Sequence, residues 1–158
     1  MTIIYPDKEF SSFNSENLNR PDISIFLAGT IDNGNSKNWQ TELIKDLEKI
    51  DNKLNYELTV YNPRRSNWDP NATKQLLEEQ IRWEQDKLDI ADLIVMNLAD
   101  DSKSPISLLE LGLYAKSEKI IVFCSKNFYR YDNVRLTCEK YNIPLFDNLT
   151  ALELIKHI

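Results

Sequence analysis

The sequence predicts a single flavodoxin-like α/β domain over residues 1–158, in which five parallel strands form a doubly wound sheet with helices on both faces. Two observations support this fold class. Short apolar segments alternate with segments of helical periodicity along the chain. The apolar segments are rich in β-branched and aromatic residues and do not alternate with polar ones, which is typical of strands covered on both faces.

The expected strands follow an N-terminal arm at residues 1–20, whose segment TIIY suggests one edge strand. They lie at residues 23–28, 57–62, 93–98, 120–124 and, as the weakest of the five, 143–146. The expected helices lie between and after them, at residues 38–50, 73–91, 106–117, 134–141 and 151–158. No repeat, low-complexity segment or linker interrupts the pattern, so we expect one domain.

The composition excludes several classes of protein. The chain is 42% hydrophobic and 28% charged, with a formal net charge of −6. An acidic surface argues against a nucleic-acid polymer as the partner. No segment approaches the roughly 18 apolar residues of a membrane span, and the N-terminus lacks the pattern of a signal peptide. We therefore expect a cytoplasmic protein without a membrane partner.

Neither a metal nor a cofactor is expected. Cys124 and Cys138 lack metal-ligand spacing and are expected to be reduced thiols. His157 is the only histidine, which argues against a zinc site or a His-dependent triad. The segment LAGT at residues 27–30 ends the first strand with a glycine but lacks the GxGxxG fingerprint of dinucleotide binding.

The fold class locates the site before any chemistry is considered. Ligands of open α/β sheets bind at the carboxyl ends of the strands, near the switch in strand order. The loops at that edge are residues 29–37, 63–72, 99–105 and 125–133. Gly29 and Thr30, which end the first strand, are accordingly expected to contact the substrate.

Glu110 is an unexpected charge in the third predicted helix. Ser104 is a suitable N-cap for this helix. Ile106, Leu109 and Leu113 are then spaced as a buried stripe, and Glu110 falls beside them. A carboxylate placed there is costly unless it is paired or used in function.

Glu84 presents the same feature in the second predicted helix. Leu77, Ile81 and Leu88 are spaced as one buried face, and Glu84 falls on that face. Two acids from helices that flank one strand can divide the roles of nucleophile and proton donor. Taken alone, Glu110 fits a structural ion-pair network as well as a functional role, and Glu84 fits a structural role better, so the functional interpretation rests on the pair.

The loop NPRRSNWD offers further binding residues. Arg64 and Arg65 are suited to an anionic group, and Trp68 is suited to stacking on a flat ring, with Asp69 beside it. Phe26 is a second aromatic candidate to contact such a ring. The alternative is a solvated turn that begins at Asn62-Pro63.

The motifs resemble those of the nucleoside 2-deoxyribosyltransferases, and most of all the branch labelled nucleoside 2-deoxyribosyltransferase-like. The resemblance covers roughly residues 23–135. It rests on the order and spacing of several short motifs: IFLAGT, Trp39-Gln40, NPRR with a nearby Trp68-Asp69, QxxWE at residues 80–84, DIADLIV at residues 89–95, and PISLLELG at residues 105–112.

This resemblance implies a mechanism. The glutamate of ELG, here Glu110, is the nucleophile that attacks the anomeric carbon of a 2-deoxynucleoside and displaces the base. The acid eight residues before Asp92, here Glu84, handles the proton of the base. A second nucleobase then attacks the deoxyribosyl-enzyme, and two inversions give net retention. The implied partners are a nucleoside and a nucleobase.

The chain departs from the family pattern at one position. Better-known members carry an aspartate six residues before the nucleophile, where it holds the sugar hydroxyls, but Ser104 stands there. Asp100 or Asp101 is expected to substitute, or Ser104 binds the sugar itself. Family members also complete each site with a residue from a neighbouring subunit. Asn133 lies in the matching region, so we expect a dimer or a larger homo-oligomer.

Three alternatives remain open at the level of sequence. The first is an N-glycoside hydrolase of nucleosides or nucleoside 5′-monophosphates, in which Arg64 and Arg65 hold the phosphate. The second is a non-catalytic nucleotide-binding module with Glu110 as a ligand contact. The third, an NAD-cleaving activity, has no specific support in the chain.

Overall fold

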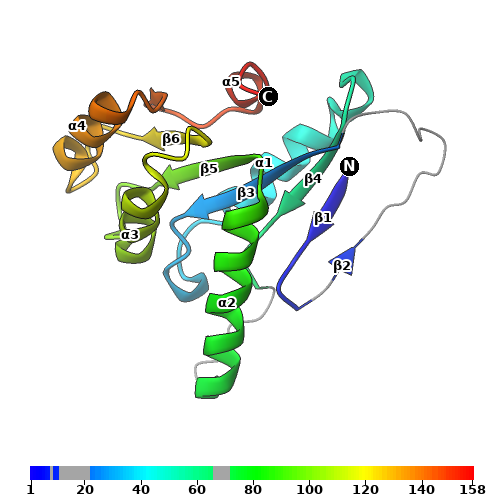
Figure 1. Ribbon diagram of the computed structural model, residues 1–158, viewed down its shortest axis with the longest axis horizontal. Helices are drawn as coiled ribbons and strands as arrows, with labels where there is room; N and C mark the ends of the chain where they lie inside the picture. Colours follow the sequence, from blue (N-terminus) through cyan, green and yellow to red (C-terminus); the bar gives the residue numbers. More distant parts are fainter. Residues whose placement is uncertain (8, 11–21, 66–71) are drawn as a thin grey trace.

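The computed structural model describes residues 1–7, 9, 10, 22–65 and 72–158 (Figure 1). The strands are β1 (Thr2–Ile4), β2 (Glu9–Phe10), β3 (Asp22–Gly29), β4 (Glu57–Tyr61), β5 (Leu93–Leu98), β6 (Ile120–Cys124) and β7 (Leu145–Phe146). The helices are α1 (Trp39–Glu48), α2 (Lys74–Ile90), α3 (Pro105–Tyr114), α4 (Tyr131–Tyr141) and α5 (Ala151–Ile155), with 3₁₀ turns at Asp32–Gly34 and Asp51–Lys53. None of the helices described here is long and apolar enough to cross a bilayer.

The described strands form one sheet in the order β2-β1-β4-β3-β5-β6-β7. Its central order, β4-β3-β5-β6-β7, is the doubly wound arrangement expected for a flavodoxin-like fold. The predicted fold class is confirmed, but the count of five strands is wrong. Strand β1 pairs with β4 as a sixth parallel strand, and β2 pairs antiparallel with β1. Strand β1 is the strand expected at TIIY, although β2 and not β1 lies at the edge of the sheet. Strand β2, of two residues, is too short to show a periodicity in sequence.

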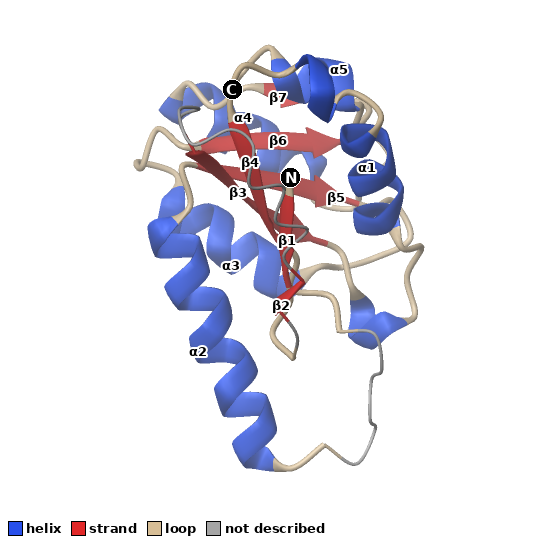
Figure 2. Cartoon of the chain, turned by 90° about the vertical axis from the view of Figure 1, so that its right-hand side faces the viewer, coloured by secondary structure: helices blue, strands red, loops and turns tan. Residues whose placement is uncertain are grey.

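Helices cover both faces of the sheet, as Figures 1 and 2 show. The strand β3 illustrates the two-sided burial, because Phe26 and Ala28 pack into one core and Ile25 and Leu27 into the other. The first core includes residues of α3 and α4 and the end of α2, and the second includes residues of α1 and α5. The unbroken apolar pattern of this strand therefore follows from its central position.

The start of β5 is fixed to the start of β3 by one aspartate. The carboxylate of Asp92 accepts hydrogen bonds from the Ser24 backbone amide at 2.8 Å and from the Ser24 hydroxyl at 2.6 Å. Both bonds lower the pKa of Asp92, and the bond from the Ser24 hydroxyl has the larger effect. Asp92 follows α2 directly, so the same contact anchors the C-terminal end of that helix to the sheet.

Two predicted helix faces are wrong. Ile106, Leu109 and Leu113 of α3 are 60%, 58% and 67% exposed, and Leu77 and Ile81 of α2 are about half exposed. Helix α3 is apolar around most of its circumference, so periodicity alone did not identify the face that packs on the sheet. That face is formed by Ser107 and Leu111, with partly buried Leu108 and Tyr114 beside them.

Gly29 is the last residue of β3, the strand that lies between β4 and β5 in the sheet. Its φ of +129° belongs to a region that side chains rarely adopt, and an added Cβ would lie 2.1 Å from the carbonyl oxygen of Asn97. The backbone of Thr30 donates to the same carbonyl at 2.9 Å. The glycine therefore allows the first loop to rest directly on β5.

We expect Gly29→Ala to lower the free energy of unfolding by about 3 kcal/mol or more, because strain and backbone overlap act together. Urea denaturation followed by circular dichroism measures the change. Gly112→Ala is the matched control, since its Cβ would meet nothing within 4 Å. This control is expected to gain about 0.5–1 kcal/mol from helix propensity. Equal stabilities of the two variants would contradict the close approach at Gly29.

Candidate active site

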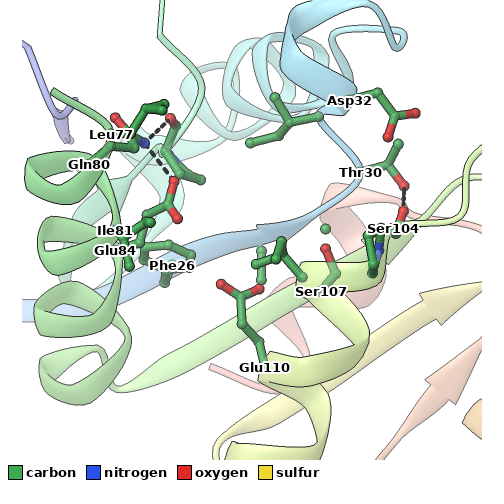
Figure 3. A pocket seen from close by; sticks show the side chains of 16 residues that line it. Phe26, Thr30, Asp32, Leu77, Gln80, Ile81, Glu84, Ser104, Ser107 and Glu110 are labelled. Atoms are coloured by element: carbon green, nitrogen blue, oxygen red, sulfur yellow. Dashed lines mark hydrogen bonds between the residues drawn. The ribbon is translucent and has the colours of Figure 1, made fainter. Parts of the chain in front are cut away.

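A pocket of about 330 Å³ opens at the carboxyl end of β3, between α2 and α3 (Figure 3). This volume lies within the range of small-molecule sites. Its position is the switch in strand order, because β4 lies on one side of β3 and β5 on the other. The pocket is lined by Phe26, Ala28, Gly29, Thr30, Ile31, Asp32, Pro63, Leu77, Gln80, Ile81, Glu84, Ser104, Pro105, Ile106, Ser107 and Glu110.

Glu84 and Glu110 meet in this pocket from different helices. Figure 3 shows the carboxyl groups of both residues directed into the same space, Glu84 from α2 and Glu110 from α3. Glu84 lies three residues after Ile81 on α2, and Ile81 also lines the pocket. Glu110 lies one turn after the buried Ser107 of α3. Both acids were predicted to face one cleft, and both line this pocket. The helix faces used for that prediction are nevertheless partly exposed.

Burial dominates the electrostatics of the pair. Removal from water raises the pKa of Glu110 to about 8, and repulsion from Glu84 adds to the shift. Burial also raises the pKa of Glu84, but a hydrogen bond from Gln80 and the positive charge of Arg65 oppose the change. At neutral pH the pair consequently retains a proton, which is a requirement for acid catalysis by one of its members.

Gln80 organises the Glu84 side of the pocket. Its amide nitrogen donates to Glu84 Oε1 at 2.6 Å and to the carbonyl oxygen of Pro63 at 3.0 Å. Its amide oxygen accepts from Arg65 Nε at 2.5 Å. Sequence analysis placed Gln80 in the QxxWE motif without giving it a role. The signal was available, because a residue four positions before Glu84 shares its face of the helix.

A cluster of hydroxyl groups forms the opposite wall. The hydroxyl groups of Thr30 and Ser104 are 2.6 Å apart, and those of Ser104 and Ser102 are 3.0 Å apart. Ser102 donates to the carboxylate of Asp32 at 2.9 Å. Asp32 lines the pocket and was not anticipated, because its loop carries no regular pattern. The pocket is thereby polar on one wall and carries Glu84 on the other.

Ser104 occupies the N-cap position of α3 but does not cap it with its side chain. Its backbone is left-handed, at φ 42° and ψ 52°, and its hydroxyl group binds Thr30 and Ser102 instead of a helix amide. The predicted capping interaction is therefore wrong. The competing hydrogen bonds keep this hydroxyl at the wall of the pocket, together with Gly29 and Thr30 as expected.

Two predicted binding residues face elsewhere. The buried guanidinium group of Arg64 donates to the carbonyl oxygens of Gly34 at 2.8 Å, Ser36 at 2.7 Å and Lys37 at 3.3 Å. Arg64 thus holds the first loop in place and does not line the pocket. Asp100 binds the hydroxyl group of Ser125 and also lies outside the pocket lining. The sequence showed which loop carries these residues but not the direction of their side chains.

Of the remaining predicted residues that the structure describes, Phe26 lines this pocket and two others do not. Asn133 is exposed on α4 and lines a second hollow between α3 and α4. Arg65 reaches the pocket only through Gln80. Trp68 and Asp69 fall outside the described residues. Phe26 lines the pocket, with its ring 6.2 Å from that of Trp83.

Metal binding has no support in the described part of the chain, where no group of three or more His, Cys, Asp or Glu side chains is placed to hold an ion. Cys124 and Cys138 are buried free thiols. Burial raises their pKa values to about 12 and about 11, so neither is a reactive thiolate at neutral pH.

The strand order and the pocket define a flavodoxin-like α/β domain with a small-molecule site that contains two acids. Residues 22–128, which are more than half of the chain, match the family described as nucleoside 2-deoxyribosyltransferase like. The chain belongs to this family. Its resemblance to the family in the sequence motifs is confirmed.

Solved structures are similar at low identity. A 2-deoxyribosyltransferase from Bacillus psychrosaccharolyticus is 17% identical with a TM-score of 0.47, and the match covers 63% of this chain and 71% of that one. A conserved protein from Enterococcus faecalis V583 is 15% identical with a TM-score of 0.49, over 85% of this chain and 87% of that one. No curated protein sequence matches the chain.

We expect Glu84→Gln to lower the pKa of Glu110, because the substitution removes the charge that repels its carboxylate. A ¹³C-NMR titration of the glutamate side chains measures this, with the Glu110 signal assigned by its loss in Glu110→Gln. Glu79→Gln is the matched control, as Glu79 is exposed on the same helix and bound by Gln75. If Glu110 titrates identically in both variants, the two acids do not interact.

Proposed function

We propose that this protein transfers the 2-deoxyribosyl group from one nucleobase to another through a covalent intermediate on Glu110. The single observation that carries the proposal is the convergence of Glu84 and Glu110, from α2 and α3, on one pocket at the switch in strand order. Membership of the nucleoside 2-deoxyribosyltransferase-like family supports the same chemistry.

In the proposed reaction the carboxylate of Glu110 attacks the anomeric carbon of the sugar. The bond between this carbon and the base breaks, its electron pair passes to the base, and Glu84 supplies a proton to the departing base. A second base then attacks the same carbon from the opposite face, Glu110 leaves as a carboxylate, and Glu84 takes up the proton of the incoming base. Two inversions give net retention.

The raised pKa of Glu110 has a role in this scheme. Before the substrate binds, the two acids share one proton. Only the arrangement with Glu84 protonated and Glu110 ionised is reactive. The positive charge that develops on the sugar stabilises the carboxylate of Glu110 as the base departs. A pocket that buries both acids also limits the access of water to the intermediate, which favours transfer over hydrolysis.

The two walls suggest how a nucleoside would lie. The hydroxyl groups of Thr30 and Ser104, together with Asp32, are suited to the sugar, and Glu84 and Phe26 are suited to the base. The expected substitution of Asp100 for the missing family aspartate has no support from the geometry, whereas Asp32 lies at the pocket wall. The guanidinium group of Arg64 binds the first loop, so a nucleoside fits the pocket better than its 5′-monophosphate.

A base-exchange assay tests the proposal. Incubation with a 2′-deoxynucleoside and a different free base is expected to give the new deoxynucleoside, detected by liquid chromatography. Glu110→Gln is expected to lower kcat/KM by a factor on the order of 10³ or more, because the nucleophile is lost. Glu79→Gln is the control with full activity.

The other outcomes of this assay identify the alternatives. Equal release of base with and without an acceptor would establish a hydrolase and overturn the transferase. Binding of nucleosides without any turnover would establish a binding module. A wild-type level of exchange in Glu110→Gln would exclude the covalent intermediate on that residue.

We further propose that the protein forms a homo-oligomer through the exposed apolar stripe of α3, which consists of Ile106, Leu109 and Leu113. These side chains are apolar, adjacent along the helix and more than half exposed. The stripe continues toward Leu77 and Ile81 of α2 through the pocket wall. Exposed apolar surfaces of this kind are typical of interfaces, and each large side chain covered contributes roughly 1.5–3 kcal/mol.

Leu109→Glu is expected to lower the molar mass measured by light scattering to that of the monomer, because a charge in the interface must be desolvated without a partner. Leu152→Glu is the matched control, since Leu152 is 72% exposed on α5, away from the stripe. A wild-type mass of one chain, or dissociation by the Leu152 variant alone, would contradict this interface.

A further inference from the structure

The side chain of Gln80 is held in one orientation by the chemistry of its neighbours. Arg65 is a donor only, and its Nε lies 2.5 Å from the amide oxygen of Gln80. The carbonyl oxygen of Pro63 is an acceptor only and lies 3.0 Å from the amide nitrogen. A flipped amide would bring donor to donor and acceptor to acceptor, so the amide nitrogen must face Glu84.

This orientation distinguishes the two oxygens of Glu84. Both hydrogens of the Gln80 amide nitrogen are used, one for Pro63 and the other for Glu84 Oε1 at 2.6 Å. In a protonated carboxyl group the carbonyl oxygen is the better acceptor of an N–H bond, and the other oxygen carries the hydrogen. The bond from Gln80 therefore leaves Oε2 as the oxygen for the proton.

We propose that Gln80 is a positioning residue that assigns the transferable proton of Glu84 to Oε2, and that Arg65 fixes the orientation of Gln80. This inference rests on the proposed role of Glu84 as proton donor. Gln80 is 6% exposed, and three hydrogen bonds already occupy its amide, so it acts through Glu84 and does not read the base.

The arrangement has a consequence for both halves of the reaction. The proton leaves Oε2 for the departing base and returns to Oε2 from the incoming base. One oxygen in one place serves both steps, so donor and acceptor bases must present their proton-bearing nitrogen to the same point. The bond from Gln80 also stabilises the ionised form of Glu84, so the protonated acid releases its proton to the departing base more readily in the first step.

Gln80→Met tests the inference, since methionine has a similar length and volume but cannot donate. We expect the pKa of Glu84 to rise by about one unit, because a hydrogen bond to the charged form is lost. The ¹³C-NMR titration measures this shift without any need for activity. We also expect kcat for base exchange to fall about tenfold with little change in KM, and the pH profile of kcat/KM to move to higher pH.

Helix α2 offers a matched control. Gln75 donates to Glu79 at 2.9 Å, also four residues along, but this pair is exposed and outside the pocket. Gln75→Met is expected to leave both the titration of Glu84 and the kinetics unchanged. Arg65→Met is the second variant in case Gln80→Met does not fold, and it is expected to raise the pKa of Glu84 in the same direction.

The outcomes separate this inference from the proposed function. An unchanged titration of Glu84 in folded Gln80→Met or Arg65→Met would overturn the positioning role even in an active transferase. If the pKa of Glu84 rises in Gln80→Met but the wild-type protein exchanges no bases, the hydrogen-bond assignment is confirmed and the transferase is refuted. A shift in the titration with an unchanged pH profile and kcat would show that Glu84 does not transfer the proton.

Discussion

The burial of two acids in one pocket is the constraint on which this site depends. Burial raises the pKa of both Glu84 and Glu110, and a doubly protonated pair would offer no carboxylate as a nucleophile. The two acids differ in their neighbours. Gln80 and Arg65 favour the charged form of Glu84, whereas both causes that act on the pKa of Glu110 favour its neutral form. In the proposed reaction, the positive charge that develops on the sugar would allow Glu110 to ionise. Ionisation of Glu110 would in this way be coupled to the presence of a substrate.

The sheet makes this arrangement possible by bringing distant parts of the chain to one edge. Strands β3 and β5 are adjacent although α1, β4 and α2 lie between them in sequence. The carboxyl end of β3 consequently lies beneath both α2 and α3, and each helix contributes one acid. Asp92 fixes the other end of β5 to Ser24, so the two helices are set on a sheet whose register is locked.

The fold and the two acids were predictable because they depend on local patterns that the structure preserves. The strand β3 reads as unbroken apolar sequence because both of its faces are buried, and the helices begin near the expected residues. The resemblance to the family pointed to Glu84 and Glu110, whereas the helical spacing that pointed to the same pair relied on faces of α2 and α3 that are largely exposed. The directions of individual side chains did not follow, as Arg64 and Ser104 show, because tertiary hydrogen bonds with loop residues determine them. The buried face of α3 was not predictable, because leucines and isoleucines lie on several sides of that helix.

Helix α2 packs on the core at its C-terminal end, and Gln80 nearer its middle donates to the carbonyl oxygen of Pro63. Its C-terminal end packs through Leu88 and Ala91 on the core, whereas its N-terminal half extends beyond the sheet, as Figures 1 and 2 both show. A small tilt about the anchored end displaces Leu77 further than Glu84, which lies nearer the pivot. Such a tilt would change the width of the cleft at Leu77 more than the separation of Glu84 and Glu110. If the proposed reaction holds, the pocket would then admit rings of different size with little change in the distance between the two acids.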